Sequence, residues 1–501
     1  SRHNHRIDEY GGSLENRLRL FRAVLADTRD AVGDRCAPAI RFAVDELMGS
    51  AGIERDGEGR DIVAALAEEP DLWDVNLSDW SNDSQSARFS QEGYQEDYTR
   101  FVKQVTTKPV VGVGRYTSPD TMVRLIRQGH LDLIGAARPS IADPFLPLKI
   151  QEGRIDDIRE CIGCNICVAG DNIVAPMRCT QNPTIGEEWR KGWHPERVPA
   201  LAGPSAALIV GGGPAGLEAA RALSQRGASV VIADAGTEWG GRVSRESRLP
   251  GLSTWARVRD WRLGQLRVAS NVEMYLSSPL TADDILSYGI EHVAIAVGAR
   301  WREDGVGRFH RLPLPFLGNG RVTGVDSILD EGSSAAGRGP VVIFDDDRYY
   351  MGSALADELA SAGIDTTYVT PSPLVAAWTV NTLEQARIHR RLLELGVKIR
   401  VLSALADRTA ETLTIRCVYS GAVEVIPCDT LVPVTARIPS SDLWAALQAR
   451  RQEWPDRGLT RIERIGDCLA PGTIAAANYS GHQFARSLGA LAETESADAF
   501  R

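Results

Sequence analysis

Short apolar runs alternate with amphipathic stretches over the first 150 residues. Four apolar runs of strand length lie at residues 37–42, 72–77, 109–113 and 131–136. Apolar residues recur at helical spacing between these runs, at 61–69, 94–105 and 119–128. Strands linked by helices predict a parallel sheet with crossover helices, because parallel neighbours need such connections. Four strands are too few to close a barrel of eight.

A linker rich in Pro, Ala and Gly, RVPALAGPS, marks a domain boundary at residues 197–205. The stretch ALIVGGGPAGLEAARAL, which follows the linker, predicts an apolar strand, a tight turn and a helix. A second strand, turn, helix and strand are predicted in GPVVIFDDDRYYMGSALADELASAGIDTTYVTPS, at residues 339–372. Both patterns are typical of Rossmann-like units, so the sequence predicts two of them after the linker.

The turns of these two units predict different chemistry. In the first, Gly211, Gly213 and Gly216 have GxGxxG spacing between strand and helix, and Asp234 ends the next strand. Such glycines let a pyrophosphate approach the helix N-terminus while the acid binds a ribose hydroxyl, so an adenine-nucleotide site is predicted. The second turn reads DDDRYYMG, whose carboxylates and tyrosines would repel and block a pyrophosphate. We therefore expect no working NAD(P)H site there.

Four cysteines in CIGCNICVAGDNIVAPMRC indicate a redox site. Cys161, Cys164 and Cys167 form a CxxCxxC triplet, and Cys179 follows after eleven residues. Three thiolates on one loop with a fourth from the returning chain are typical of a [4Fe–4S] cluster. A structural zinc site favours two separated CxxC pairs and is the first alternative; incidental core thiols are the second. The remaining cysteines are scattered, which suits reduced thiols in the cytoplasm.

Composition and charge narrow the class of partner. The chain has 501 residues, enough for about three domains, and a net charge of −10 with no basic stripe. Nucleic acid and anionic membrane surfaces are therefore not expected as partners. No run of eighteen apolar residues or signal peptide is present in the sequence, so we expect no membrane segment and a cytoplasmic protein.

Several longer motifs carry a family resemblance. DEYGGSLENR, PVVGVGRYTSPD, IGAARPSIADPFLP, the cysteine motif and QNPTIGEEWRKGWHPE resemble the iron–sulfur flavoprotein amine dehydrogenases. This group, with trimethylamine, dimethylamine and histamine dehydrogenases, belongs to the old-yellow-enzyme-like family that also contains 2,4-dienoyl-CoA reductase. The resemblance covers essentially the whole chain. It implies that the N-terminal region is the second half of an FMN-binding barrel whose first four strands precede the printed sequence.

The resemblance implies an α/β protein with four parts. Residues 1–150 form the half-barrel, 151–204 carry the [4Fe–4S] cluster and linker, 205–335 with 455–501 bind FAD or ADP, and 336–454 form an inserted, degenerate NAD(P)-type domain. HVAIAVGAR and LTRIERIGDCLAPG resemble later strands of the disulfide-reductase-like nucleotide fold. The implied nucleotide contacts, besides the three glycines and Asp234, are Gly241, Arg242, Gly298, Gly466 and Asp467.

The resemblance also implies roles in the flavin region. Arg41 approaches the flavin ring, where its charge stabilises the reduced form. The loops after the last two strands hold the FMN phosphate through Gly114, Arg115, Ala137 and Arg138. Asp83 orients a catalytic His, and Trp80 is one wall of an aromatic bowl for an alkylammonium group. The simpler interpretations are surface salt bridges, a loop-capping Asp and a barrel-rim Trp.

The implied function is oxidative N-demethylation of a secondary or tertiary amine such as trimethylamine or dimethylglycine. Electrons pass through FMN and the cluster to an electron-transferring flavoprotein, and the enzyme is expected to be a homodimer. The stretch VAGDNIV lacks the aromatic residue found there in trimethylamine dehydrogenase, which favours a larger amine. Two alternatives remain: an NADPH-dependent 2,4-dienoyl-CoA-type reductase, and an electron-transfer fragment that is catalytically incomplete without the first barrel half.

Overall fold

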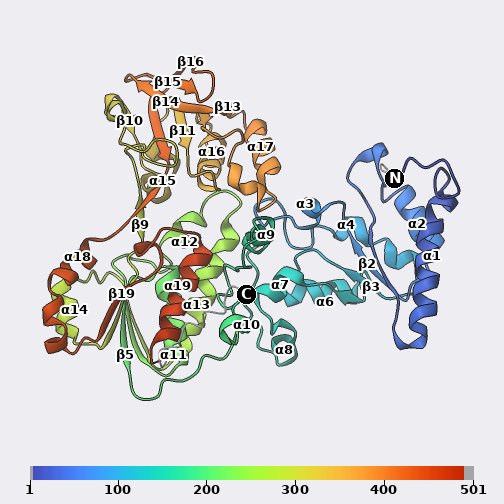
Figure 1. Cartoon of the computed structure of the whole chain (residues 1–501), viewed down its shortest axis with the longest axis horizontal. Coiled ribbons are helices and arrows are strands. Elements are labelled where there is room, and N and C mark those ends of the chain that lie inside the picture. The colour runs from blue at the N-terminus through green and yellow to red at the C-terminus, as the bar shows by residue number, and fades with distance from the viewer. Residues whose placement is uncertain (1–3, 490–501) are drawn as a thin grey trace. The chain divides into compact units, whose positions relative to one another are not determined.

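The computed structural model describes residues 4–489. Residues 1–3 and 490–501, the latter at the end of the expected 455–501 segment, lie outside the described residues. The chain divides between Ile155 and Asp156 into two compact units, coloured from blue to teal and from teal to red in Figure 1. Each unit has its own sheets and core, so each is described by itself.

The first unit is built on a parallel sheet whose strands follow sequence order, which confirms the predicted alternation. Its strands are β1 (Ala39–Ala43), β2 (Leu72–Asn76), β3 (Val110–Gly112) and β4 (Leu133–Ile134). Helices α2 (Glu58–Leu66) and α6 (Pro119–Arg127) connect strands, α1 (Leu14–Val32) precedes β1, and α7 (Ala137–Ala142) and α8 (Leu146–Gln151) follow β4. Figure 1 shows α1 beside α2, and an ion pair between Arg17 and Glu58 joins them.

One helix prediction in this unit is wrong. The expected helix at 94–105 is two short helices, α4 (Glu96–Thr99) and α5 (Val102–Val105). The helical backbone bonds extend to Arg100, whose amide donates to the Glu96 carbonyl over 3.1 Å, and the chain turns at residues 100–101 before α5 begins. A further short helix, α3 (Trp80–Asp83), follows β2 and begins at Asp79, whose carboxylate accepts the Asn82 amide.

The second unit contains a parallel sheet in the order β19-β8-β5-β6-β7. Its strands are β5 (Ala206–Val210), β6 (Ser229–Ala233), β7 (Val272–Tyr275), β8 (His292–Ile295) and β19 (Arg461–Arg464). Its helices are α11 (Pro214–Gln225), α12 (Arg242–Glu246), α13 (Arg257–Val268), α14 (Ala282–Tyr288) and α19 (Ile474–Ser487). The order places β5 at the centre, with β6 on one side and β8 on the other. The predicted first Rossmann-like unit is thereby confirmed.

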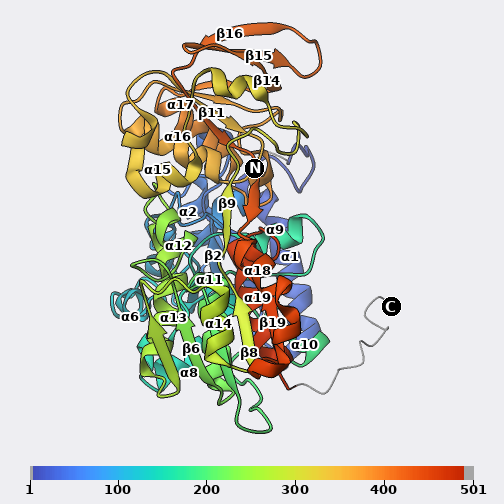
Figure 2. The same cartoon turned by 90° about the vertical axis from the view of Figure 1, so that its left-hand side faces the viewer.

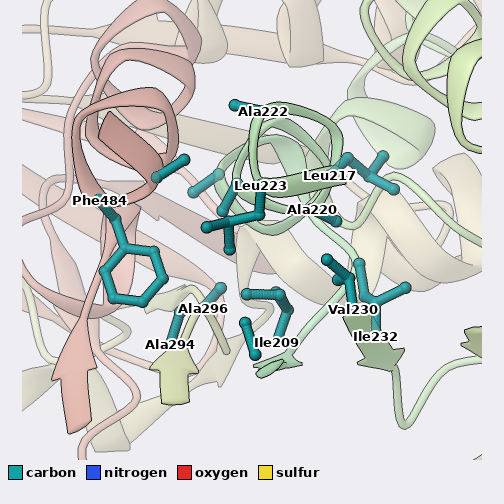
Figure 3. Close-up of a cluster of buried hydrophobic side chains, with 14 of the residues drawn as sticks. Ile209, Leu217, Ala220, Ala222, Leu223, Val230, Ile232, Ala294, Ala296 and Phe484 are labelled. Carbon is teal, nitrogen blue, oxygen red and sulfur yellow. The ribbon is translucent and has the colours of Figure 1, made fainter. Parts of the chain in front are cut away.

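The core of this sheet lies under α11 (Figure 3). Leu217 and Leu223 of α11 pack towards Ile209 and Ile232 of the sheet, and Phe484 of α19 closes the cluster. The other α11 members of this apolar cluster are alanines, including Ala219, Ala220 and Ala222. Small side chains let α19 pack closely on α11, which orders the chain's last described helix against the nucleotide-type sheet.

A second parallel sheet is inserted between β9 and β18, in the order β10-β17-β11-β12-β13. Its strands are β10 (Arg321–Val322), β11 (Val341–Asp345), β12 (Thr366–Val369), β13 (Lys398–Arg400) and β17 (Thr430–Val434), and its helices are α15 (Val325–Glu331), α16 (Met351–Ser361) and α17 (Gln385–Glu394). Figure 2 shows the antiparallel sheet of β14 (Ser403–Arg408), β15 (Thr412–Cys417) and β16 (Val423–Pro427) at one end of this domain. Leu413 and Ile415 pack there on Phe344.

A two-stranded connection joins the inserted sheet to the β5 sheet of the same unit. The pair β9 (Ala299–Trp301) and β18 (Arg437–Pro439) is antiparallel, and α18 (Asp442–Ala449) packs Leu447 into the core beside α14. We therefore propose boundaries for the inserted domain between β9 and β10 and between β17 and β18. No helix among residues 4–489 is long and apolar enough to cross a membrane.

The Phe484 contact gives a stability prediction. Phe484 is 2% exposed in the core, so Phe484→Ala should lower the free energy of unfolding of the nucleotide-type domain by about 3–5 kcal/mol. Phe309→Ala, at a side chain that is 43% exposed, is the control and should change it little. Equal losses in both variants, measured by denaturant unfolding followed by circular dichroism, would contradict this packing.

Candidate functional site

The first candidate site lies at the sheet of the first unit. The register places Arg41 of β1 opposite Asp74 of β2, and Arg41 Nη1 donates to Asp74 Oδ2 over 2.9 Å. Arg41 Nη2 donates to Asp83 Oδ2 over 3.3 Å, while the buried Gln95 donates from Nε2 to Asp83 Oδ1 over 2.8 Å. The structure thus brings together Arg41 and Asp83. Trp80, one turn earlier on α3, is 44% exposed.

Two members of this group were missed by sequence reasoning. Asp74 lies in the alternating strand WDVN and Gln95 in a polar loop, and neither belongs to a recognisable motif. Only the strand register could have pointed to Asp74. Asp74 Oδ1 and Gln95 Oε1 are buried and have no hydrogen-bond partner among the described residues. Buried polar atoms without partners cost free energy, so this group fits a polar ligand such as a flavin ring edge.

The predicted phosphate loops converge on the segment that follows α3. Arg115 Nη1 and Arg138 Nη1 donate to the carbonyl of Gln85 over 3.0 and 2.8 Å. Both guanidinium groups are buried. Gly114 has no room for a side chain, because a Cβ there would lie 3.0 Å from the Tyr116 ring. Ala137 begins α7 directly after the last strand. The two loops therefore bring a glycine and two cations together, a set that fits a phosphate.

The second candidate site is the cysteine segment of the second unit. Cys161 and Cys164 precede α9 (Ile166–Asn172), Cys167 is buried in its first turn, and Cys179 follows on the returning chain. The thiols of Cys161, Cys164 and Cys179 lie close enough to interact electrostatically. Polar groups face the sulfurs: Gly163 N donates to Cys161, Gln181 N donates to Cys179, and the Thr180 hydroxyl contacts Cys164, at 3.4, 3.3 and 3.2 Å.

A zinc ion and a [4Fe–4S] cluster would need different spacings of these donors. Among residues 4–489, no three His, Cys, Asp or Glu side chains are close enough to hold a single metal ion. A tetrahedral zinc ion with bonds of about 2.3 Å would bring its sulfurs to about 3.8 Å from one another. A cubane cluster holds its thiolates farther apart, because four iron atoms stand between them. Burial raises the pKa of Cys164 to about 12 and that of Cys179 to about 11, so thiolates here need a metal to be stable.

The third candidate site is a cleft of ≈ 620 Å³ at the turn between β5 and α11. The predicted residues that line it are Gly211, Gly213, Asp234, Gly241, Arg242, Gly298 and Asp467. Gly216 and Gly466 lie behind it, since a Cβ on Gly216 would meet the Gly211 carbonyl at 1.9 Å and one on Gly466 would meet Ala215 at 2.6 Å. Asp234 accepts the Gly212 and Gly236 amides over 2.5 and 2.7 Å. This geometry fits an adenosine diphosphate group.

Part of the cleft lining is a group of ion pairs. Arg242 and Arg437 both donate to Asp467 Oδ2, over 2.7 and 2.5 Å, and both donate to the carbonyl of Gly472. The guanidinium of Arg437 also lies over the Trp301 ring, 5.5 Å from its centroid. Arg437 was missed by sequence reasoning because it precedes no glycine-rich turn and belongs to no motif.

The carboxylates in the turn after β11 accept hydrogen bonds from backbone amides of the same unit. Asp345 Oδ1 accepts the Arg348 amide over 2.9 Å, and Asp346 Oδ2 accepts the Phe309 amide over 2.5 Å. Burial and the nearby charge of Asp347 raise the pKa of Asp345 to about 7. Tyr350 packs on Trp255 and donates to Glu246 over 2.6 Å. The carboxylates and tyrosines of the DDDRYYMG turn thus bond to neighbouring groups of the same unit, and the absence of an NAD(P)H site there stays a prediction.

Comparison with known proteins gives the family. Residues 1–157 match the NADH:flavin oxidoreductase / NADH oxidase family, 209–260 a NAD(P)-binding Rossmann-like domain, and 326–420 the OYE-like second alpha/beta domain. A dimethylamine dehydrogenase from Hyphomicrobium sp. (strain x) is 40% identical, and the match covers 97% of this chain and 70% of the relative.

Two solved structures are similar throughout. The 6-hydroxypseudooxynicotine amine oxidase from Pseudomonas geniculata N1 is 50% identical with a TM-score of 0.94, covering 97% of this chain and 72% of that one. Histamine dehydrogenase from Rhizobium sp. 4-9 is also 50% identical with a TM-score of 0.94, covering 96% and 70%. These likenesses confirm the resemblance of the sequence motifs: the chain belongs to the flavin-dependent amine dehydrogenases of the old-yellow-enzyme-like oxidoreductase family.

Proposed function

We propose that this protein oxidises an amine at FMN and passes the electrons through a cysteine-bound [4Fe–4S] cluster to an electron-transferring flavoprotein. The observation that carries the amine chemistry is the position of Asp83, held on one oxygen by Arg41 and on the other by Gln95. A carboxylate fixed on both sides is suited to orient a catalytic group in one geometry. When bound, FMN supplies the acceptor for the electrons of the amine C–H bond.

The chain's own residues would bind this flavin at two points. Arg41, with Asp74, would contact the ring, and its positive charge favours the reduced form. Gly114, Arg115, Ala137 and Arg138 would surround the phosphate, where backbone amides approach at the glycine and the guanidinium groups neutralise charge. Trp80 would hold the ammonium group of the substrate against its ring face.

The substrate we propose is an amine larger than trimethylamine. The segment after Cys167 has no aromatic side chain to narrow the site. Two of the similar structures are named for histamine and for 6-hydroxypseudooxynicotine, both larger than trimethylamine. Oxidation converts the amine to an iminium, which water hydrolyses to a carbonyl compound and the shorter amine. An N-methyl group on the substrate would be released as formaldehyde.

We further propose that the nucleotide cleft binds ADP and not FAD. The GxGxxG turn and Asp234 support the adenosine diphosphate end. The cleft is also lined by Arg242 and Arg437, whose guanidinium groups both pair with Asp467 and are therefore already engaged without a flavin ring. The closed turn at Asp345 gives no support to NADPH as donor, so the reductase alternative is disfavoured.

Asp83 gives the test of the amine chemistry. Asp83→Asn should retain FMN but slow its reduction by amine about a hundredfold, because the amide no longer orients a proton-accepting group. Trp80→Ala should instead raise KM for the amine. Anaerobic stopped-flow spectroscopy measures both, and Asp97→Asn, at a side chain that is 75% exposed, is the matched control. Wild-type flavin reduction in Asp83→Asn would leave Asp83 with only a loop-capping role.

Cys164 gives the test of the cluster. Cys164→Ser should remove the iron and acid-labile sulfide while the adenine nucleotide stays bound, because the cleft lies in a separate fold of the unit. Cys36→Ser, at an exposed cysteine far from the motif, should keep both. Stoichiometric zinc without sulfide in anaerobically purified wild-type protein would contradict the cluster.

Gly216 gives the test of the nucleotide. Denatured wild-type enzyme should release FMN and ADP on chromatography, and Gly216→Val should release FMN with little ADP, because the side chain collides with the Gly211 carbonyl. Gly264→Val, at an exposed position of α13 where a side chain meets nothing within 4 Å, is the control for a glycine outside the cleft. FAD in the wild-type extract would contradict the proposal that the cleft binds ADP.

A further inference from the structure

A fully buried ion pair lies between the nucleotide-type fold and the cysteine segment. Glu218 of α11 and Arg262 of α13 are both 0% exposed, and Arg262 Nε donates to Glu218 Oε2 over 2.8 Å. The other nitrogens of Arg262 face away from Glu218. Nη1 donates to Gln181 Oε1 over 3.1 Å and Nη2 donates to the Gln181 carbonyl over 3.0 Å. The guanidinium therefore stands between the carboxylate and the cysteine segment.

Gln181 connects both ends of that segment. Its amide donates to Cys179 Sγ over 3.3 Å, and its side-chain Nε2 donates to the carbonyl of Glu160 over 3.1 Å, directly before Cys161. Arg262 holds Gln181 by two hydrogen bonds, so it fixes the donor to the Cys179 sulfur and the start of the cysteine loop together. Arginine is suited to this role because its planar fork presents several donors in one rigid geometry.

The charge on this pair is well defined. Burial alone would raise the pKa of Glu218, but the charges of Arg221 and Arg262 and a hydrogen bond from His482 hold it well below its usual range. Burial lowers the pKa of Arg262 to about 10, which still leaves it protonated at neutral pH. Other cations also lie near the cysteines, since Arg159 acts electrostatically on Cys179 and Arg257 donates to the Cys161 carbonyl over 3.4 Å. Arg262 is the cation that holds Gln181, and its counter-charge Glu218 lies on the far side from the cysteine segment.

We propose that Arg262 is a positioning residue that acts through Gln181 and raises the reduction potential of the cluster bound by the four cysteines; this rests on the cluster assignment of the proposed function. Reduction adds one negative charge to a centre that already carries four thiolates. A buried cation stabilises that added charge because the surrounding dielectric is low, and an N–H donor to a ligating sulfur acts in the same direction. Glu218 opposes this effect from a greater distance.

The two members of the pair should shift the potential in opposite directions. Arg262→Gln should lower the equilibrium constant for cluster reduction about tenfold, which is about 59 mV for a one-electron couple. Glu218→Gln should raise the potential by a smaller amount, because its charge lies behind that of Arg262. Arg267→Gln removes an exposed cation from the same helix and should leave the potential unchanged. A purely structural role would not give shifts of opposite sign.

Each purified holoenzyme variant is first analysed for iron and sulfide. A redox titration at fixed pH and ionic strength, monitored by electron paramagnetic resonance, then gives the reduction potential of the cluster. Opposite shifts in Arg262→Gln and Glu218→Gln support the proposal. Equal potentials in iron-replete variants, or a fall in both, overturn it and leave the cluster assignment intact. Wild-type protein without iron and sulfide overturns the cluster assignment itself and this proposal with it. If Arg262→Gln loses the cluster, Glu218→Gln decides alone: a higher potential supports the proposal, and an unchanged or lower one overturns it.

Discussion

The second unit depends on a saturated network of buried charge around Glu218. One carboxylate, fully enclosed on α11, accepts bonds from Arg221 and Arg262 and pairs with His482 of α19. Removing one partner of such a group costs several kcal/mol, because the remaining charges cannot be solvated. Three helices and, through Arg262, the cysteine segment are therefore fixed relative to the same point. The nucleotide-type fold thus also serves as the base on which the cysteine segment is held.

Histidine fits this network in its neutral form. Burial lowers the pKa of His482 to about 4, and Arg486 donates to its Nε2 over 2.9 Å, so the Nδ1 proton is directed at Glu218. The network then holds one carboxylate between the guanidinium groups of Arg221 and Arg262, and His482 adds no further charge. His482 can reach Glu218 only if α19 packs closely on α11. The small alanine side chains of α11 allow this close packing.

Sequence reasoning was most successful where chemistry is local in the chain. The βα repeats, the glycine-rich turn and the carboxylate-filled turn at Asp345 were all predicted from short patterns, and the family followed from longer motifs. The continuous helix predicted over 94–105 was wrong, because the chain turns between α4 and α5 while the apolar spacing runs through that break. Asp74, Gln95, Arg437 and Arg262 were missed, since each acts through a partner that is distant in sequence and visible only in the fold. The roles of the predicted site residues stay predictions until they are tested.

The central claim is that electrons taken from an amine reach a cluster held by Cys161, Cys164, Cys167 and Cys179. Low-temperature electron paramagnetic resonance after anaerobic mixing of the enzyme with amine, without an electron acceptor, tests it most directly. The account predicts the signal of a reduced [4Fe–4S] cluster, formed with amine and not with NADPH. A signal formed with NADPH alone, or no iron–sulfur signal with any amine that reduces the flavin, would contradict it.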